Sequence, residues 1–588
     1  MKRRYLFLVA AIIALLALAA CGRGNGEETT GDQNGGNQEQ AAETPTPADD
    51  NQAADPAPPE ERPTVVLVIN VENGQDDTNA MWKYQAVLEM EDILGINLEL
   101  RSQTTDQDLL MITAGEIPDI FQARNEFMTQ LILGGHITPM DDLVGRYAPH
   151  LAADPLRLDF LRTFQSEGTG RLYGISHGAG GGGNMHQPQT QHFIRWDLYS
   201  QLGYPEINSL NDMIDVLAAM VELEPVNMHG APTFAIGAWV DWGTFPFVAI
   251  GYQGVVGTEI SPVLMLHQDG RYIHTYTYIN SNIWGNLRTF NRADQLGVFD
   301  RDSLVQGHAE WAAKAHTGQY MTLPFSWEIG PFNEHMREIH GLDTLIGHAF
   351  MPHEDMWVFA NMNSPFGNTD YLWTIGANST VQDAAMRFID YINSPEGVRQ
   401  LMSGTEGTTI EIFNGRPEIR MDLLSDEPGT PSLEGLLWNN SNMVGLSPSN
   451  PHPADGHPLS LFLTPRAFSL QNTHLDTVAA AHFGAEYPFG VAQIRIDQGR
   501  AFDYIGFNNT LVAAVESPPM NIQRIDDLLA EIIWRAIPEA ITAPSDEAFL
   551  EVFERTVAEL EAAGHAESVA WWTQAYQDAA ASLGDFAR

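Results

Sequence analysis

The chain of 588 residues carries 76 aspartates and glutamates against 30 lysines and arginines, which gives a net charge of −46. Such an acidic surface repels nucleic acid and anionic lipid headgroups, and it argues against an acidic polymer as ligand unless a local basic pocket exists. The single cysteine, Cys21, excludes an intrachain disulfide and leaves no Cys–His nucleophile in the rest of the chain. The chain is longer than one hydrophobic core usually supports, so we expect two lobes or more.

The first twenty residues have the layout of a secretory signal. Three basic residues at positions 2–4 precede a short apolar core at 5–17, which is shorter than the ~20 apolar residues of a membrane span. Residues 18–21 read LAAC, and we interpret them as a lipobox in which the sulfur of Cys21 receives diacylglycerol. An ordinary signal peptide with an incidental cysteine is the alternative.

Residues 22–63 form a predicted tether. They are dominated by Gly, Asn, Gln, Glu, Thr, Ala, Pro and Asp, so they have almost nothing apolar to bury. A flexible chain of about 40 residues has an r.m.s. span of roughly 35 Å. This tether would let a folded domain work clear of a membrane while it stays attached, although an extension without a role would have the same sequence.

The region after the tether alternates predicted strands and helices. Residues 64–70, TVVLVIN, are β-branched and continuous, as in a strand buried on both faces. Apolar residues at helical spacing then predict a helix ended by Gly95, a strand at 96–100, a helix stopped at Gly115 and a short strand at 117–121. This order is typical of a parallel α/β sheet, in which ligands lie beyond the carboxyl ends of the strands.

Two later segments are equally informative. In residues 384–407, Ser394 can cap a helix that begins at Pro395 and ends at Gly404, after a preceding amphipathic helix. Residues 237–254, GAWVDWGTFPFVAIGYQG, are dense in aromatic and small residues. A hydrophobic core is the more common use of such rings, but the interleaved polar and aromatic groups around position 240 also suit a sugar site.

Four motifs carry a family resemblance: IPDIFQARNEF, TFPFVAIGYQG, MTLPFSWEIG and TIGANSTVQDAAMRFIDYINSPEG, in this order. They resemble the family 1 extracellular solute-binding proteins of bacterial ABC importers, which include maltose-binding protein. The resemblance runs from about residue 64 to residue 421. The segment WWTQAYQDA at 571–579 is similar to the C-terminal helix of longer members that bind oligosaccharides.

The resemblance implies an α/β, two-lobe periplasmic-binding-protein-like fold, with a ligand cleft between lobes that are each discontinuous in sequence. The chain would return from the second lobe to the first near residues 366–375. The implied divisions are a lipoprotein signal peptide (1–20), the lipidated cysteine and linker (21–63), the first lobe (64–180 and 366–430), the first part of the second lobe (181–365), and its completion with the C-terminal helices (431–588).

The resemblance also implies which residues contact a ligand. Their expected roles are hydrogen bonding to hydroxyl groups and stacking of aromatic rings on the apolar face of a sugar. The implied contacts are Glu72 and Asn73 after the first strand, Arg124, Asn125 and Glu126 after PDI, Trp239, Asp241 and Trp242 before TFPF, and Trp327 after MTLPFS. Where sugar-binding members often have a ring after PDIF, this chain has Gln122.

Metal sites and enzymatic sites find weaker support. His335 and His340 are five residues apart, whereas ligands on one helix face require a spacing of three or four. We interpret these two and His177, His186 and His192 as surface or loop histidines. The stretch EPVNMHG stands where some relatives have a calcium loop, so we expect no metal, and we expect no cofactor. Because the chain has so many carboxylates, any two could be proposed as the catalytic pair of a glycoside hydrolase, but no local sequence motif identifies a particular acid and base.

The resemblance therefore implies a lipid-anchored, non-enzymatic receptor on the extracytoplasmic face of the cell membrane. It would capture a carbohydrate, most simply an oligosaccharide, by lobe closure and deliver it to ABC permease subunits. We expect a monomer that reaches the membrane through its lipid anchor only and binds no nucleic acid. A surface glycosidase or lyase, and a ligand sensor for a membrane kinase, remain alternatives, as do peptide or other solutes.

Overall fold

The computed structural model of this protein describes residues 62–70, 84–180, 190–241, 258–266, 271–352, 356–358, 364–424, 436–437, 444–503 and 509–587. The predicted signal, Cys21 and the tether to residue 61 lie outside these residues, and so do Glu72, Asn73, His186 and Trp242. None of the helices in the described ranges is both long and apolar enough to cross a lipid bilayer.

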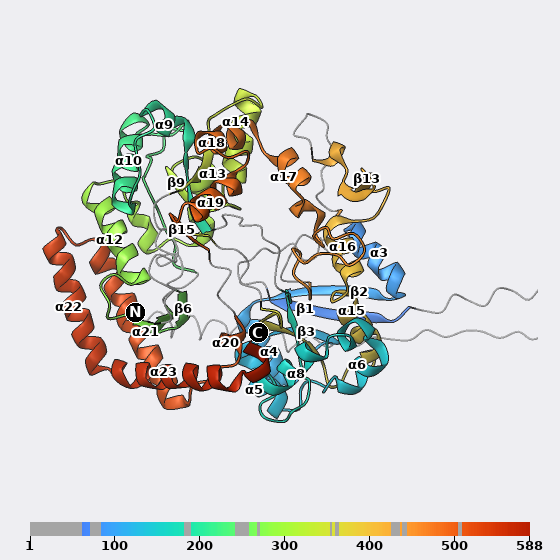
Figure 1. The fold of residues 1–588 in the computed structure, drawn as a ribbon. Helices are drawn as coiled ribbons and strands as arrows, with labels where there is room; N and C mark the ends of the chain where they lie inside the picture. The colour runs from blue at the N-terminus through green and yellow to red at the C-terminus, as the bar shows by residue number, and fades with distance from the viewer. Residues whose placement is uncertain are drawn as a thin grey trace, which may run out of the picture. The chain divides into compact units, whose positions relative to one another are not determined.

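A five-stranded sheet in the order β2-β1-β3-β12-β4 organises the first of two hydrophobic cores (Figure 1). Strand β1 (Thr64–Asn70) runs parallel to β2 (Asn97–Gln103) and to β3 (Ile120–Arg124). Strand β12 (Asn368–Ile375) lies antiparallel between β3 and β4 (Ile175–His177). A segment from far along the chain therefore completes a sheet that the first part of the chain begins.

The local signals in the first part of this sheet are confirmed. Helix α3 (Gln85–Leu94) ends at Gly95 and α4 (Thr105–Ala114) ends at Gly115, both glycines with left-handed φ values of 62° and 72°. The predicted strand at 117–121 begins only at Ile120, because Pro118 has no N–H group to donate to the neighbouring strand.

The helices that cover the first core come from two distant parts of the chain. Ser394 caps α16 by accepting a hydrogen bond from the Gly397 N–H, Pro395 is the first helical residue and Gly404 follows the last, as predicted. Besides α3 and α4, the helices of this core include α5 (Met128–Leu133), α6 (Asp141–Tyr147), α7 (Pro149–Ala152), α8 (Pro155–Phe164), α15 (Gln382–Tyr391) and α16 (Pro395–Ser403).

The second core is built around a three-stranded sheet. Strand β5 (Thr190–Arg195) lies antiparallel between β9 (Thr322–Phe325) and β10 (His348–Met351). A separate meander consists of β6 (Thr258–Ser261), β7 (Leu264–Leu266) and β8 (Tyr272–His274). The surrounding helices are α9 (Trp196–Gln201), α10 (Leu210–Leu223), α12 (Asn282–Gln295), α13 (His308–His316), α14 (Gly330–His340) and α18 (His474–His482).

Two small elements accompany the cores. The hairpin of β13 (Ile410–Phe413) and β14 (Arg416–Ile419) forms a separate hydrophobic cluster with α17 (Pro465–Gln471). Strand β11 (Met356–Val358) pairs in parallel with β15 (Ala501–Asp503), which follows α19 (Pro488–Asp497). Each core combines a sheet with helices packed around it, which makes this an α/β fold, as the sequence predicted.

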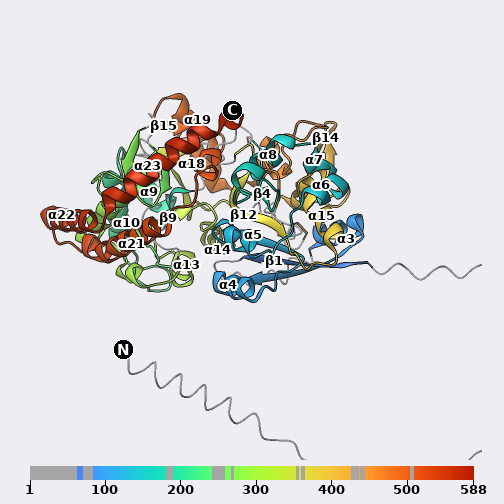
Figure 2. The ribbon, with the colours of Figure 1, turned by 90° about the horizontal axis from the view of Figure 1, so that it is seen from below.

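The C-terminal helices contact both cores. Helix α20 (Asn509–Ala513) places Ala513 in the first core, and α21 (Met520–Ile541), α22 (Asp546–Ala562) and α23 (His565–Ser582) pack on the second. Figures 1 and 2 show the course of α21, α22 and α23 in red at the end of the chain. Beyond α23, Leu583 and Phe586 pack in the first core again. Val444 and Leu459 also belong to the first core, although they lie beyond the division predicted at residue 430.

Candidate functional site

Polar side chains gather at one edge of the first sheet, where β3 and β4 end and β12 begins. We call Arg124, Glu126, His177, Asp370 and Tyr371 the first-core cluster. Arg124 ends β3, His177 ends β4, and β12 runs in the opposite direction, so Asp370 and Tyr371 come from near its start. The antiparallel register places Tyr371 opposite Arg124. The carboxyl edge of such a sheet is where ligands bind in open α/β folds.

The members of the first-core cluster are bonded to one another. Nη1 of Arg124 lies 3.3 Å from Oε1 of Glu126, and Nη2 of Arg124 donates to Oη of Tyr371 at 3.5 Å. The Arg124 guanidinium also lies 5.7 Å from the centroid of the Tyr371 ring, within reach of a cation–π attraction. Nε2 of His177 lies 2.7 Å from Oδ1 of Asp370. The sequence predicted Arg124 and Glu126 here, and only the structure adds the other three.

The interpretation of His177 and His192 as surface or loop histidines is wrong. Both lie on strands and are only 2 % exposed. Burial acts to raise the pKa of Asp370, but the hydrogen bond and the charge interaction with His177, together with backbone hydrogen bonds, lower that pKa. The pair therefore holds a carboxylate in its charged form at the edge of the sheet.

A second group of residues lies after β9 and at the ends of α13. We call Asp241, His308, His316, Trp327 and Glu328 the second-core cluster. Trp327 and Glu328 occupy the turn between β9 and α14, and His308 and His316 are the first and last residues of α13. The sequence predicted Asp241 and Trp327. Glu328 is adjacent to Trp327 in the motif MTLPFSWEIG, so adjacency was the available signal for it.

Trp327 offers an exposed aromatic face in this cluster. Its side chain is 53 % exposed, although tryptophan is one of the most hydrophobic residues. Its ring stacks on the fully buried ring of Phe325, with centroids 4.4 Å apart and an interplanar angle of 9°. Phe325 belongs to a strand, so the stack fixes the orientation of Trp327 before any ligand arrives.

Glu328 is an anchor for two histidines. Its side chain is 5 % exposed, and its Oε1 lies 2.9 Å from Nε2 of His308 while its Oε2 lies 3.7 Å from Nε2 of His316. Burial acts to raise the pKa of Glu328, but the two histidines outweigh it and lower the pKa to about 2. The backbone N–H of His308 donates to Oδ2 of Asp241 at 2.7 Å, so Asp241 holds the start of α13.

Trp239 lies beneath the second-core cluster. Its ring is fully buried, with the ring of Trp311 at 4.4 Å, that of His308 at 5.0 Å and that of Phe325 at 5.9 Å. The structure therefore places Trp239 in the hydrophobic core, where it supports His308 and Phe325. Of the other predicted contacts, Asn125 is exposed in the turn after β3.

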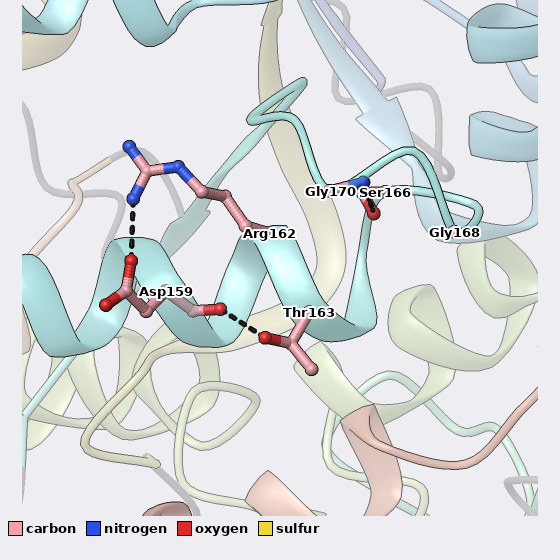
Figure 3. A pocket seen from close by; sticks show the side chains of 6 residues that line it. All are labelled: Asp159, Arg162, Thr163, Ser166, Gly168 and Gly170. Atoms are coloured by element: carbon pink, nitrogen blue, oxygen red, sulfur yellow. Dashed lines mark hydrogen bonds and ion pairs between the residues drawn. The ribbon is translucent and has the colours of Figure 1, made fainter.

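Two surface hollows of the described residues contain no residue of either cluster. Figure 3 shows a polar pocket of about 460 Å³ at the end of α8, where Nη1 of Arg162 donates to Oδ1 of Asp159 at 2.8 Å. A second hollow of about 470 Å³ adjoins β1 and β2 and includes Arg101 and Asp119. Neither contains a predicted ligand contact. The described ranges hold no group of three or more His, Cys, Asp or Glu side chains suited to a metal ion.

No family model matches the chain, and no curated protein matches its sequence. Solved structures do match its fold. They include the Streptococcus pneumoniae ABC-transporter substrate binding protein FusA in complex with kestose (14 % identity, TM-score 0.56, covering 88 % of this chain and 99 % of that one). The alginate-binding protein AlgQ2 without calcium ion matches with 14 % identity and a TM-score of 0.55, over 88 % and 98 % of the two chains.

An extracellular solute-binding protein from Bifidobacterium longum subsp. infantis matches with 13 % identity and a TM-score of 0.54, over 89 % of this chain and 99 % of that one. At such identities the likeness concerns the fold, and it extends over nearly the whole of each of these proteins. The chain has the fold of the extracellular solute-binding proteins of ABC transporters.

Proposed function

We propose that this protein is a lipid-anchored receptor that captures an extracellular oligosaccharide between its two lobes and delivers it to an ABC permease. The exposed Trp327 ring, fixed on Phe325 at the carboxyl end of β9, carries the proposal. One face of a pyranose is a patch of C–H groups, which packs on an aromatic ring, while its hydroxyl groups need polar partners nearby.

Both clusters supply such polar partners. Arg124 and Glu126 would bond ligand hydroxyl groups through charge-assisted hydrogen bonds, which are stronger than neutral ones. Asp241 and His308 would do the same beside Trp327. Asn125, Glu72, Asn73 and Trp242 remain proposed contacts. Trp239 takes the supporting role that its burial indicates.

The proposed delivery route depends on the beginning of the chain. Cys21 would carry the lipid, and the tether at 22–63 would let the receptor reach its permease while it remains at the extracytoplasmic face as a monomer. Closure of the two lobes on the ligand would be the state that the permease recognises. A Cys21→Ser variant should appear in the culture medium or in the cytoplasm instead of the membrane fraction.

The carboxylates of the clusters fit binding better than glycoside hydrolysis. A hydrolase needs a carboxylic acid that stays protonated at neutral pH, and its pKa is therefore raised. In contrast, the pKa values of Glu328 and Asp370 are lowered by their histidine partners. These two residues are charged acceptors that position their neighbours.

Isothermal titration calorimetry of the detergent-solubilised full chain against a panel of oligosaccharides tests this proposal, with mass spectrometry of every mixture afterwards. We expect at least one sugar to bind with micromolar or tighter affinity and to be recovered intact. Cleaved sugar would move the function to a surface hydrolase or lyase. Failure of every sugar to bind would remove the carbohydrate assignment.

A further inference from the structure

The charged side chains of both clusters already form hydrogen bonds or ion pairs with other groups of this chain. We infer that the ligand is an uncharged oligosaccharide, and that the carboxylates bonded to the arginine and histidine side chains of the two clusters select against acidic sugars. This inference rests on the proposed function, because it concerns the ligand of that same site.

In the first-core cluster, each basic side chain has a carboxylate bonded to it. Arg124 has Glu126 at 3.3 Å, and His177 has Asp370 at 2.7 Å. Recognition of a sugar carboxylate usually depends on an arginine whose two parallel N–H groups can face it. Here the Arg124 guanidinium also interacts with Tyr371. Its Nη2 donates a hydrogen bond to the Tyr371 hydroxyl, and the guanidinium lies within cation–π distance of the Tyr371 ring. A uronate would have to compete with Glu126 for Arg124.

In the second-core cluster, the carboxylates are the groups that already have partners in this chain. Both oxygens of Glu328 face histidines, at 2.9 Å from His308 and 3.7 Å from His316. Oδ2 of Asp241 accepts the first N–H of α13. Each of these carboxylate oxygens already has one partner in this chain, so a ligand ammonium group would have to share the oxygen with that partner. The cluster thus suits hydroxyl groups more than a second charge of either sign.

The net charge of the two clusters also disfavours an acidic sugar. Arg124 is the one arginine or lysine of the two clusters, against the four carboxylates of Glu126, Asp370, Asp241 and Glu328. An acidic sugar in this environment would meet net like charge, which discriminates against it by repulsion.

The test uses the full chain and three sets of oligosaccharides of three to five units: neutral glucans, fructans and N-acetylated chitin fragments; oligogalacturonates and alginate fragments; and deacetylated chitosan fragments. We expect binding to a neutral sugar, with every uronate at least about tenfold weaker. The affinity of the neutral sugar should change less than about twofold between 20 and 500 mM salt, because screening acts only between charges.

Each other outcome overturns a different claim. Tighter binding of a uronate or of a chitosan fragment than of every neutral sugar overturns this inference and leaves the proposed function standing. No binding by any of the three sets overturns the proposed function, and this inference with it. A steep dependence of the neutral sugar's affinity on salt concentration would contradict the claim that the charged groups of the site are paired within the chain.

A variant tests which residue sets the selectivity. In Glu126→Gln, Arg124 loses its carboxylate partner, so the ratio of uronate to neutral-sugar dissociation constants should fall at least about threefold. Glu99→Gln is the matched control, since Glu99 pairs with Arg101 two residues away on β2, outside both clusters. A fall in the control as large as in Glu126→Gln would show a general charge effect and overturn the assignment, as would an unchanged ratio in Glu126→Gln.

Discussion

Tyr576 and Leu583 lie seven residues apart, yet their side chains belong to different hydrophobic cores. Tyr576 is buried in the second core near the ring of Tyr272, and Leu583 is buried in the first. The end of α23 therefore connects the two cores, as α20 does before α21 begins. Any rearrangement of the cores on ligand binding must bend or release this connection.

Phe586 secures the end of this connection. Its ring lies 5.6 Å from the rings of Phe160 and Phe366 and 5.8 Å from that of Phe164. Phe586→Ala should lower the free energy of unfolding by about 1–3 kcal/mol, because a partly buried ring is removed from an aromatic cluster. Hydrogen exchange of residues 576–586 should accelerate more than that of α22.

Leu550→Ala is the control for the Phe586 experiment, since Leu550 is 40 % exposed on α22. If hydrogen exchange of residues 576–586 is as slow in Phe586→Ala as in the control, α23 holds its position without the Phe586 ring.

Removal of the exposed ring of Trp327 should weaken ligand binding strongly and the fold weakly. For Trp327→Ala we expect a loss of about 2–3 kcal/mol, roughly 30- to 150-fold in the dissociation constant of the sugar identified by calorimetry. The melting temperature should fall by no more than a few degrees, because half of the side chain is in solvent. Leu133→Ala, which removes a side chain 72 % exposed, should leave the affinity unchanged. Equal affinities of the two variants would remove Trp327 from the binding site.

The pairing of Glu328 with its histidines should appear as a pH dependence of stability. Burial acts to raise the pKa of Glu328, but His308 and His316 lower it to about 2 from its ordinary 4.5. A depressed carboxyl pKa contributes stability above the unfolded value, and this contribution is lost as the pH falls from about 4.5 towards 2. At pH 3 the wild type should have lost about 2 kcal/mol that Glu328→Gln does not lose.

Urea unfolding of the wild type and of Glu328→Gln at pH 6, 4 and 3 measures this difference. The variant should be the less stable protein at pH 6, and the gap should narrow as the pH falls. Two parallel curves would contradict the stabilising role of the charged Glu328.

His565 should make the fold sensitive to mild acid. It is 4 % exposed at the first position of α23, with the ring of His274 at 5.7 Å. Burial first, and His274 second, lower the pKa of His565 to about 4. The positive end of the helix dipole opposes the imidazolium as well. The unfolded chain takes up this proton below about pH 6.5 and the folded chain does not, so stability falls between pH 6.5 and 4, by up to about 3 kcal/mol.

His565→Leu should flatten the decrease of stability between pH 7 and 5. His335→Leu, which changes a histidine side chain 43 % exposed, should retain the wild-type slope. Chemical unfolding at both pH values compares the three proteins. An unaltered slope in His565→Leu would show that other groups cause the acid sensitivity.

The sequence by itself determined the local elements of this protein. The β-branched run of β1, the glycines that end α3 and α4, and the cap of α16 by Ser394 act through neighbours within a few residues, so they are readable without a structure. The order of these elements and four motifs were then enough to predict the two-lobe α/β fold, which the solved structures match.

The tertiary structure decided which of the candidate residues face a ligand. Trp239 and Trp327 are the same residue type in similar motifs, but Trp311 and Phe325 bury the first and Phe325 only supports the second. Asp370 reaches His177, which lies 193 residues earlier in the chain, because β12 inserts between β3 and β4. Burial and hydrogen bonding at these places depend on contacts between distant segments, which no local pattern of residues encodes.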